Sequence, residues 1–117
     1  MGYLTTHILD TMSGTPAVGV AITLFKIQGD KKVKIAASMT NSDGRCENPI
    51  LPESMFEIGK YELEFSISEY FKNKGIQQQD PHFLEDIVIR FGINNPHDHY
   101  HVPLLVSPYG YSTYRGS

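Results

Sequence analysis

The sequence predicts an all-β domain, a two-sheet β-sandwich of seven to eight strands with one short helix. Two observations lead to this prediction. Apolar residues alternate with polar or small ones through much of the chain, which is the period of a half-buried strand. Turn sequences rich in Gly, Pro, Asn, Asp and Ser separate these runs, as expected for several short strands in one sandwich.

The predicted strands cover most of the chain and include both ends. The first is expected around Thr5–Asp10, a run that contains His7. Further alternating runs follow at residues 18–24, 33–39, 61–67, 87–91 and 102–106. The run 61–67 is the clearest, because four apolar residues alternate with two glutamates and a serine. A last strand is expected at 109–115, so the two ends of the chain are predicted to lie within a sheet.

One short helix is expected after the 61–67 run. Ser68 is the candidate N-cap, Glu69 lies in the first turn, and Gly75 follows the last turn. About two turns are too few to be stable in isolation. Tyr70 and Phe71 are therefore expected to pack against the sheets.

Composition and charge limit the classes of function. The length of 117 residues fits one domain over residues 1–117, and 40% hydrophobic with 20% charged residues is an ordinary globular balance. The net charge is −3 and no stripe of Lys and Arg is present, so neither nucleic acid nor a membrane surface is an expected partner. The single cysteine, Cys46, excludes an internal disulfide, which suits a reducing compartment.

The expected location is the cytoplasm. The first residues lack the charged and apolar regions of a signal peptide. No apolar run approaches the roughly 20 residues that span a bilayer. A periplasmic location would apply if a signal peptide has been removed from the chain.

Histidines near the C-terminus are the first candidates for chemistry. With a strand period of two, His99 and His101 share one face, and His97 joins them only if Pro96 does not hold it in a turn. Two histidines spaced in this way can bind zinc, but no Cys or carboxylate has an obvious ligand spacing. A metal site is therefore not the favoured interpretation. The alternative without chemistry is a polar strand face on the surface.

The other polar candidates each have a structural alternative. His7 could be a strand histidine bonded to a backbone carbonyl, and Arg45 a solvated residue after the turn 41–44. Cys46 is assigned no role. The Tyr-rich end around Tyr114 could form a subunit contact or bind a planar polar ligand, and composition does not choose between them.

Three motifs, in order, resemble the transthyretin-related proteins. They are the opening Leu4–Asp10 followed by Gly14-Thr-Pro-Ala17, the central Asp43-Gly-Arg45, and the ending that runs from His-Tyr-His-Val-Pro at residue 99 to Tyr-Arg-Gly-Ser117. The terminal Tyr-Arg-Gly-Ser resembles the mark that separates the 5-hydroxyisourate hydrolases of this family from transthyretin, the thyroid-hormone carrier. The resemblance covers the whole chain.

This resemblance implies a fold and an activity. The fold would be a transthyretin-like two-sheet sandwich, assembled as a homotetramer (a dimer of dimers) with active sites in a channel between the dimers. The activity would be hydrolysis of 5-hydroxyisourate to 2-oxo-4-hydroxy-4-carboxy-5-ureidoimidazoline in urate (purine) catabolism. The partner would be this small molecule, and no metal or cofactor would be required. The alternative is a transthyretin-like carrier of a small ligand without catalysis.

The resemblance also implies a set of site residues. The catalytic residues would be His7, Arg45 and His101, and the substrate-binding residues would be His7, Arg45, His99, Tyr114 and Ser117. A histidine with a pKa near 6.5 suits the general acid and base, and Arg45 would polarise the reacting carbonyl. Which histidine is the base is left open.

Overall fold

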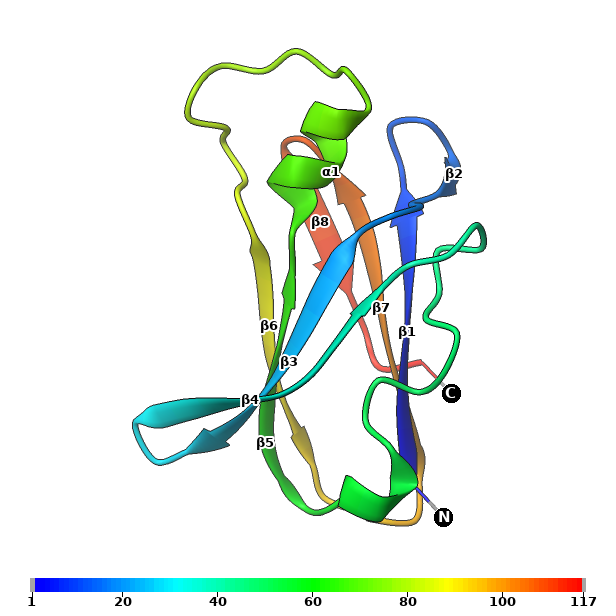
Figure 1. Cartoon of the computed structure of the whole chain (residues 1–117), viewed down its shortest axis with the longest axis vertical. Helices are drawn as coiled ribbons and strands as arrows, with labels where there is room; N and C mark the ends of the chain where they lie inside the picture. Colours follow the sequence, from blue (N-terminus) through cyan, green and yellow to red (C-terminus); the bar gives the residue numbers. More distant parts are fainter. Residues whose placement is uncertain (1, 117) are drawn as a thin grey trace.

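Two four-stranded sheets pack face to face in the computed structural model, which describes residues 2–116 (Figure 1). The first sheet has the order β2 (Thr15–Pro16), β1 (Tyr3–Asp10), β7 (His99–Ser107), β8 (Gly110–Thr113). The second has the order β4 (Lys31–Met39), β3 (Ala21–Gln28), β5 (Gly59–Phe65), β6 (Ile87–Ile93). The predicted all-β sandwich with one short α-helix is confirmed. The predicted role of Ser117 lies outside the described residues.

The first and the last strand of the chain both lie in the first sheet. Strand β1 pairs with β7 in parallel, from Tyr3 opposite His99 to Asp10 opposite Val106. Strand β8 continues the sheet antiparallel to β7. This arrangement places the outward residues of β1 directly beside those of β7, and the candidate site depends on it.

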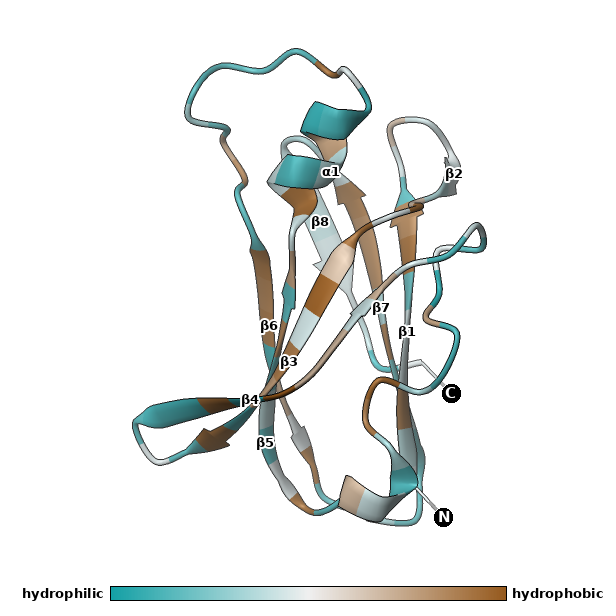
Figure 2. Cartoon of the chain, viewed as in Figure 1, coloured by the Kyte–Doolittle hydropathy of each residue, from teal (hydrophilic) through white to brown (hydrophobic). Residues whose placement is uncertain are grey.

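The core lies between the two sheets. The side chains of Leu4, Ile8, Leu24, Leu63 and Phe65 are fully buried there. Their strand neighbours point outward and are partly accessible, as the alternating burial along β1 shows. Hydrophobic residues accordingly concentrate in the strands, while the loop after the helix is largely hydrophilic (Figure 2).

Some predicted strand bounds and faces are wrong. Val18 precedes β3 and is 53% exposed. Val33 and Met39 also remain exposed, because both lie on β4, an edge strand of the second sheet. The turn end of the β3–β4 hairpin projects away from the sandwich (Figure 1). The last strand ends at Thr113, so Arg115 lies beyond it. The short 3-10 helix η1 (Glu53–Met55) was not predicted.

The helix α1 (Ile67–Asn73) begins two residues earlier than the proposed cap, Ser68, would allow. Its N-cap is Ser66, whereas Ser68 lies in the first turn with its hydroxyl 2.7 Å from Nδ1 of His82. The expected packing of Tyr70 and Phe71 is confirmed, since both are buried. No helix in the described part of the chain is long and apolar enough to cross a membrane.

A buried carboxylate connects the helix to the first sheet. Asp10, at the end of β1, accepts hydrogen bonds from the Tyr70 hydroxyl at 2.8 Å and the Lys74 ammonium at 3.3 Å. Burial alone would raise the pKa of Asp10, but these bonds and those from Ser13 hold the pKa below its ordinary value. The interaction fixes the C-terminal end of β1, whereas the candidate site lies near the start of this strand.

Candidate active site

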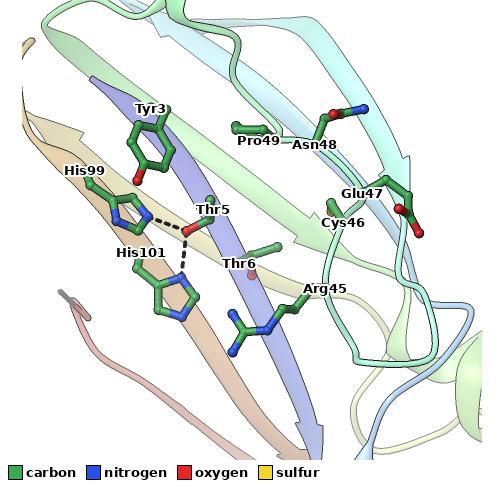
Figure 3. A pocket seen from close by; sticks show the side chains of 10 residues that line it. All are labelled: Tyr3, Thr5, Thr6, Arg45, Cys46, Glu47, Asn48, Pro49, His99 and His101. Carbon is green, nitrogen blue, oxygen red and sulfur yellow. Dashed lines mark hydrogen bonds between the residues drawn. The ribbon is translucent and has the colours of Figure 1, made fainter. Parts of the chain in front are cut away.

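The outward face of β1 and β7 brings three polar side chains into contact. Thr5 lies opposite His101 in the parallel pair. Its Oγ1 is 2.6 Å from Nε2 of His99 and 2.8 Å from Nδ1 of His101 (Figure 3). The ring of Tyr3 stacks on that of His99, with centroids 4.2 Å apart and planes 12° apart. Side chains of β1 therefore hold both histidines of β7 in place.

The loop that carries Arg45 is fixed against β1 by a glycine. Gly44 has a φ of +74°, and a Cβ there would lie 2.5 Å from the carbonyl oxygen of Ile8. The amide of Ile8 donates to the Gly44 carbonyl at 2.9 Å, and Arg45 forms an isolated bridge with His7. Only glycine permits this approach, and it places Arg45 at the outer face of the first sheet.

A cavity of about 430 Å³ lies between this loop and the two strands. His99, His101 and Thr5 line one side, and Arg45 and its successors 46–49 line the other. The Arg45 side chain extends across β1 in the direction of the histidines (Figure 3). The structure thus brings together three of the predicted site residues, Arg45, His99 and His101. His7 lies beside the cavity, paired with Arg45, but is not part of its lining.

The electrostatics of the site favour the neutral forms of His7 and His101. Burial lowers the pKa of His101, and the positive charges of Arg45, His99 and His7 lower it further. Burial and Arg45 likewise lower the pKa of His7, although Asp43 partly opposes them. Both imidazoles are therefore mostly unprotonated at neutral pH and able to accept a proton.

The C-terminal tail packs against the back of His101. The amide of Gly116 donates to the His101 carbonyl at 2.8 Å, and a Cβ at Gly116 would lie 2.7 Å from Cδ2 of the His101 ring. Arg115 turns away, with its guanidinium 4.1 Å from the Tyr100 ring centroid and 3.4 Å from a carboxylate oxygen of Asp98. The tail therefore positions His101 through its backbone.

Tyr114 is not part of the cavity lining in this chain. It is 60% exposed and borders a separate hollow beside Tyr100 and Val102. His97 also lies apart, in the turn before β7, where its amide donates to Asn95. No three His, Cys, Asp or Glu side chains among residues 2–116 form a cluster that could hold a metal ion.

Sequence reasoning missed Tyr3 and Thr5 as site residues, and it named the tail that contains Gly116 without its contact with His101. The period of two along the first strand places Tyr3 and Thr5 on the same face as His7, which is a usable signal. Their contacts with His99 and His101 depend on a parallel pairing between segments more than 90 residues apart.

Comparison with known proteins settles the family. Residues 4–116 match the HIUase/Transthyretin family. The chain belongs to this family. It is 50% identical to a 5-hydroxyisourate hydrolase of Pseudomonas aeruginosa over 117 residues, which are 100% of this chain and 93% of that protein.

Solved structures of the same fold carry different functions. An (S)-allantoin synthase structure matches with a TM-score of 0.93 and 47% identity over 99% of this chain, but this chain spans only 44% of that one. Sea bream transthyretin in complex with thyroxine matches with a TM-score of 0.86 and 32% identity, over 97% of this chain and 93% of that one. The family fold therefore serves more than one function, and the site must distinguish them.

Proposed function

We propose that this protein hydrolyses 5-hydroxyisourate to 2-oxo-4-hydroxy-4-carboxy-5-ureidoimidazoline, a step of urate catabolism. One observation carries the proposal. The guanidinium of Arg45 and the imidazole of His101 border a single cavity, in a chain half identical over its full length to a hydrolase of this substrate. The pair combines a proton acceptor with a fixed cation, as hydrolysis of a ring amide requires.

His101 is the proposed general base. Its Nδ1 is occupied by Thr5, so Nε2 is the nitrogen available to a water molecule. His101 takes a proton from water as the oxygen attacks the ring carbonyl. Arg45 donates hydrogen bonds to the oxyanion that develops on that carbonyl.

His7 is the proposed partner acid. When the tetrahedral intermediate collapses, the ring carbon–nitrogen bond breaks and the leaving nitrogen takes up a proton. His7 pairs with Arg45 next to the cavity, and the charge of Arg45 lowers the pKa of His7. The minor fraction of His7 that is protonated can supply that proton, since the His7 pKa is lowered. The proton that His101 took from water then passes through solvent to His7, which returns both rings to their starting states.

Substrate binding is proposed for five residues. His7, Arg45 and His99 lie in or beside the cavity and can contact the C=O and N–H groups of the planar substrate. Tyr114 and Ser117 are proposed from their place in the terminal motif. The exposed ring of Tyr114 is available to a ligand or to a neighbouring subunit.

The active assembly is proposed to be a homotetramer, a dimer of dimers with the sites in a channel. The exposed tyrosines 109, 111 and 114 around β8 support an interface on this side of the molecule, since tyrosine is frequent in subunit contacts. Light scattering is expected to give four times the chain mass of 13.2 kDa. A monomer would contradict the channel. A cytoplasmic location stays a prediction.

The competing function is a small-ligand carrier like transthyretin. A carrier of an apolar hormone would favour an apolar pocket, whereas this cavity contains two histidines and an arginine. The test is the ultraviolet decay of freshly made 5-hydroxyisourate, with and without the protein, in buffer that contains a chelator. We expect faster decay with the protein. A decay rate with the protein that equals the rate in buffer alone, both before and after divalent metal is added, would refute the proposed hydrolase activity.

A further inference from the structure

We propose that Thr5 is a positioning residue for the reaction, whose hydroxyl links His99 to His101, directs Nε2 of His101 to the cavity, and stabilises the imidazolium that forms there. The inference rests on the proposed function, which it deepens. Thr5 need not touch the substrate to act in this way.

The geometry of Thr5 supports a relay of two hydrogen bonds. A hydroxyl donates one hydrogen and accepts through its lone pairs. Its oxygen is within hydrogen-bond distance of one nitrogen from each ring, Nε2 of His99 and Nδ1 of His101. With both rings neutral, one facing nitrogen donates to the hydroxyl and the hydroxyl donates to the other. The two histidines therefore have linked tautomers.

Protonation of His101 selects one direction of the relay. When Nε2 of His101 takes a proton from water, both of its nitrogens carry hydrogen, and Nδ1–H must donate to the Thr5 oxygen. The Thr5 hydrogen then points to Nε2 of His99, which is unprotonated while its Nδ1 carries the hydrogen. No proton is gained or lost in this arrangement apart from the one taken from water.

The surroundings of His101 make this acceptor important. The titratable and charged groups near the ring are His7 on β1, Arg45 on the loop, and His99 on β7, and all of them disfavour a second positive charge. The tail contributes the backbone of Gly116. No carboxylate of residues 2–116 is within ion-pair distance of His101. The Thr5 oxygen is thus the group that accepts from the charged ring.

Neighbouring contacts hold the relay in place. Tyr3 stacks on His99, and Gly116 lies against His101. The register of β1 and β7 places Thr5 directly opposite His101. The three side chains are therefore preorganised, which is the condition under which an orienting hydrogen bond contributes to a transition state.

The first test compares three variants. Thr5→Val keeps the shape of the side chain but removes the hydroxyl, and we expect kcat to fall about 10- to 100-fold with KM nearly unchanged. The acid limb of the kcat/KM profile should move to lower pH, because the charged ring loses its acceptor. Thr5→Ser should restore both. Thr11→Val is the matched control, since the Thr11 hydroxyl bonds to the backbone of Val106 and to no histidine.

The second test does not depend on activity. Long-range ¹H–¹⁵N spectra of the full-length protein report the tautomer and the pKa of each histidine. We expect His101 to show a lower pKa in Thr5→Val than in the wild type, and His99 to change its tautomer distribution. If Thr5→Val does not fold, Thr5→Ala serves in its place.

The outcomes separate the two proposals. A wild-type protein that does not hydrolyse 5-hydroxyisourate would refute the function, while the spectra would still report the relay. An active wild type with unchanged kcat, acid limb and His101 pKa in the Thr5 variants would refute the relay alone. A smaller loss in His99→Ala than in Thr5→Val would support it, since the Thr5 oxygen could still accept from His101.

Discussion

The outer faces of the two sheets differ in whether their charged side chains form ion pairs. On the second sheet, the carboxylate of Glu62 is only 3% exposed and accepts from Lys32 at 2.9 Å and from Arg90 at 3.0 Å. On the first sheet, Arg45 gathers with His7 and His101, and no carboxylate among residues 2–116 forms an ion pair with it. On one face, charges of opposite sign are paired. On the other, the cation of Arg45 lies near two titratable histidines and has no carboxylate partner among residues 2–116.

The difference separates residues that stabilise the fold from residues that are set up for chemistry. The carboxylate of Glu62 is buried in its charged form. Removal of one of its partners, or of its own charge, is therefore expected to lower the free energy of unfolding. Burial and Arg45 lower the pKa values of His7 and His101, which favours the neutral rings that can accept a proton. Substitutions on the two faces should therefore affect different measurements.

Replacement of the histidines should have the largest effect. His101→Ala removes the proposed base, and we expect kcat/KM to fall about 10²- to 10⁴-fold. His7→Ala should also lose activity, but less, because His7 lies beside the cavity rather than in its lining. The midpoint of thermal unfolding serves as the control. Near-normal turnover of folded His101→Ala would remove His101 from the mechanism.

The two arginines provide a matched comparison. Arg45→Ala should lower kcat/KM about 10²- to 10³-fold with little change in the free energy of unfolding, since the Arg45 side chain is exposed and its proposed role is to bind the substrate and stabilise the developing oxyanion. Arg90→Ala should show the reverse, a lower free energy of unfolding with normal turnover, because Arg90 pairs with Glu62. Equal losses of activity in both variants would contradict the division between the faces.

The sequence pattern predicted local structure better than long-range contacts. The alternation predicts the strands correctly, but it also assigns Val33 to a buried face, because burial depends on β4 being an edge strand. The Thr5–His101 contact requires the parallel β1–β7 pairing, which no local pattern indicates. Ser68 is a good capping residue by type, yet the helix starts earlier and Ser68 bonds to His82 instead. Of the candidate site, the motif resemblance supplied Arg45, His99 and His101, whereas the structure supplied their contacts and added Tyr3 and Thr5.

Glu62 tests the paired face through stability. Glu62→Gln keeps the shape but removes the charge, and we expect a loss of about 2 kcal/mol in the free energy of unfolding. The value is modest because Lys32 and Arg90 are partly exposed to solvent. Chemical denaturation with a constant m-value measures it, and turnover per folded molecule should stay unchanged. A stability equal to that of the wild type would mean that the desolvation cost of the Glu62 charge equals the stabilisation from its ion pairs with Lys32 and Arg90.

The pH dependence of turnover should show the smallest effect. The direction of its shift is nevertheless the result that depends most directly on His101. The pKa of His101 is lowered from 6.5, first by burial and then by Arg45, His99 and His7. The base is active when neutral, so turnover should persist below pH 6.5 and decline only as the pH falls through the lowered pKa. The same shift weakens folding below pH 6.5, because the unfolded chain then binds more protons than the native one.

Two substitutions should move this acid limb in opposite directions. Arg45→Ala removes a positive neighbour, so the His101 pKa rises and the limb moves to higher pH. Thr5→Val removes the acceptor of the charged ring, so the pKa falls and the limb moves to lower pH. The residual activity of both variants permits the measurement. A limb that moves the same way in both, or that lies above 6.5 in the wild type, would mean that another group controls turnover. Opposite shifts would identify His101 as the titrating base, since it is the ring that both residues affect.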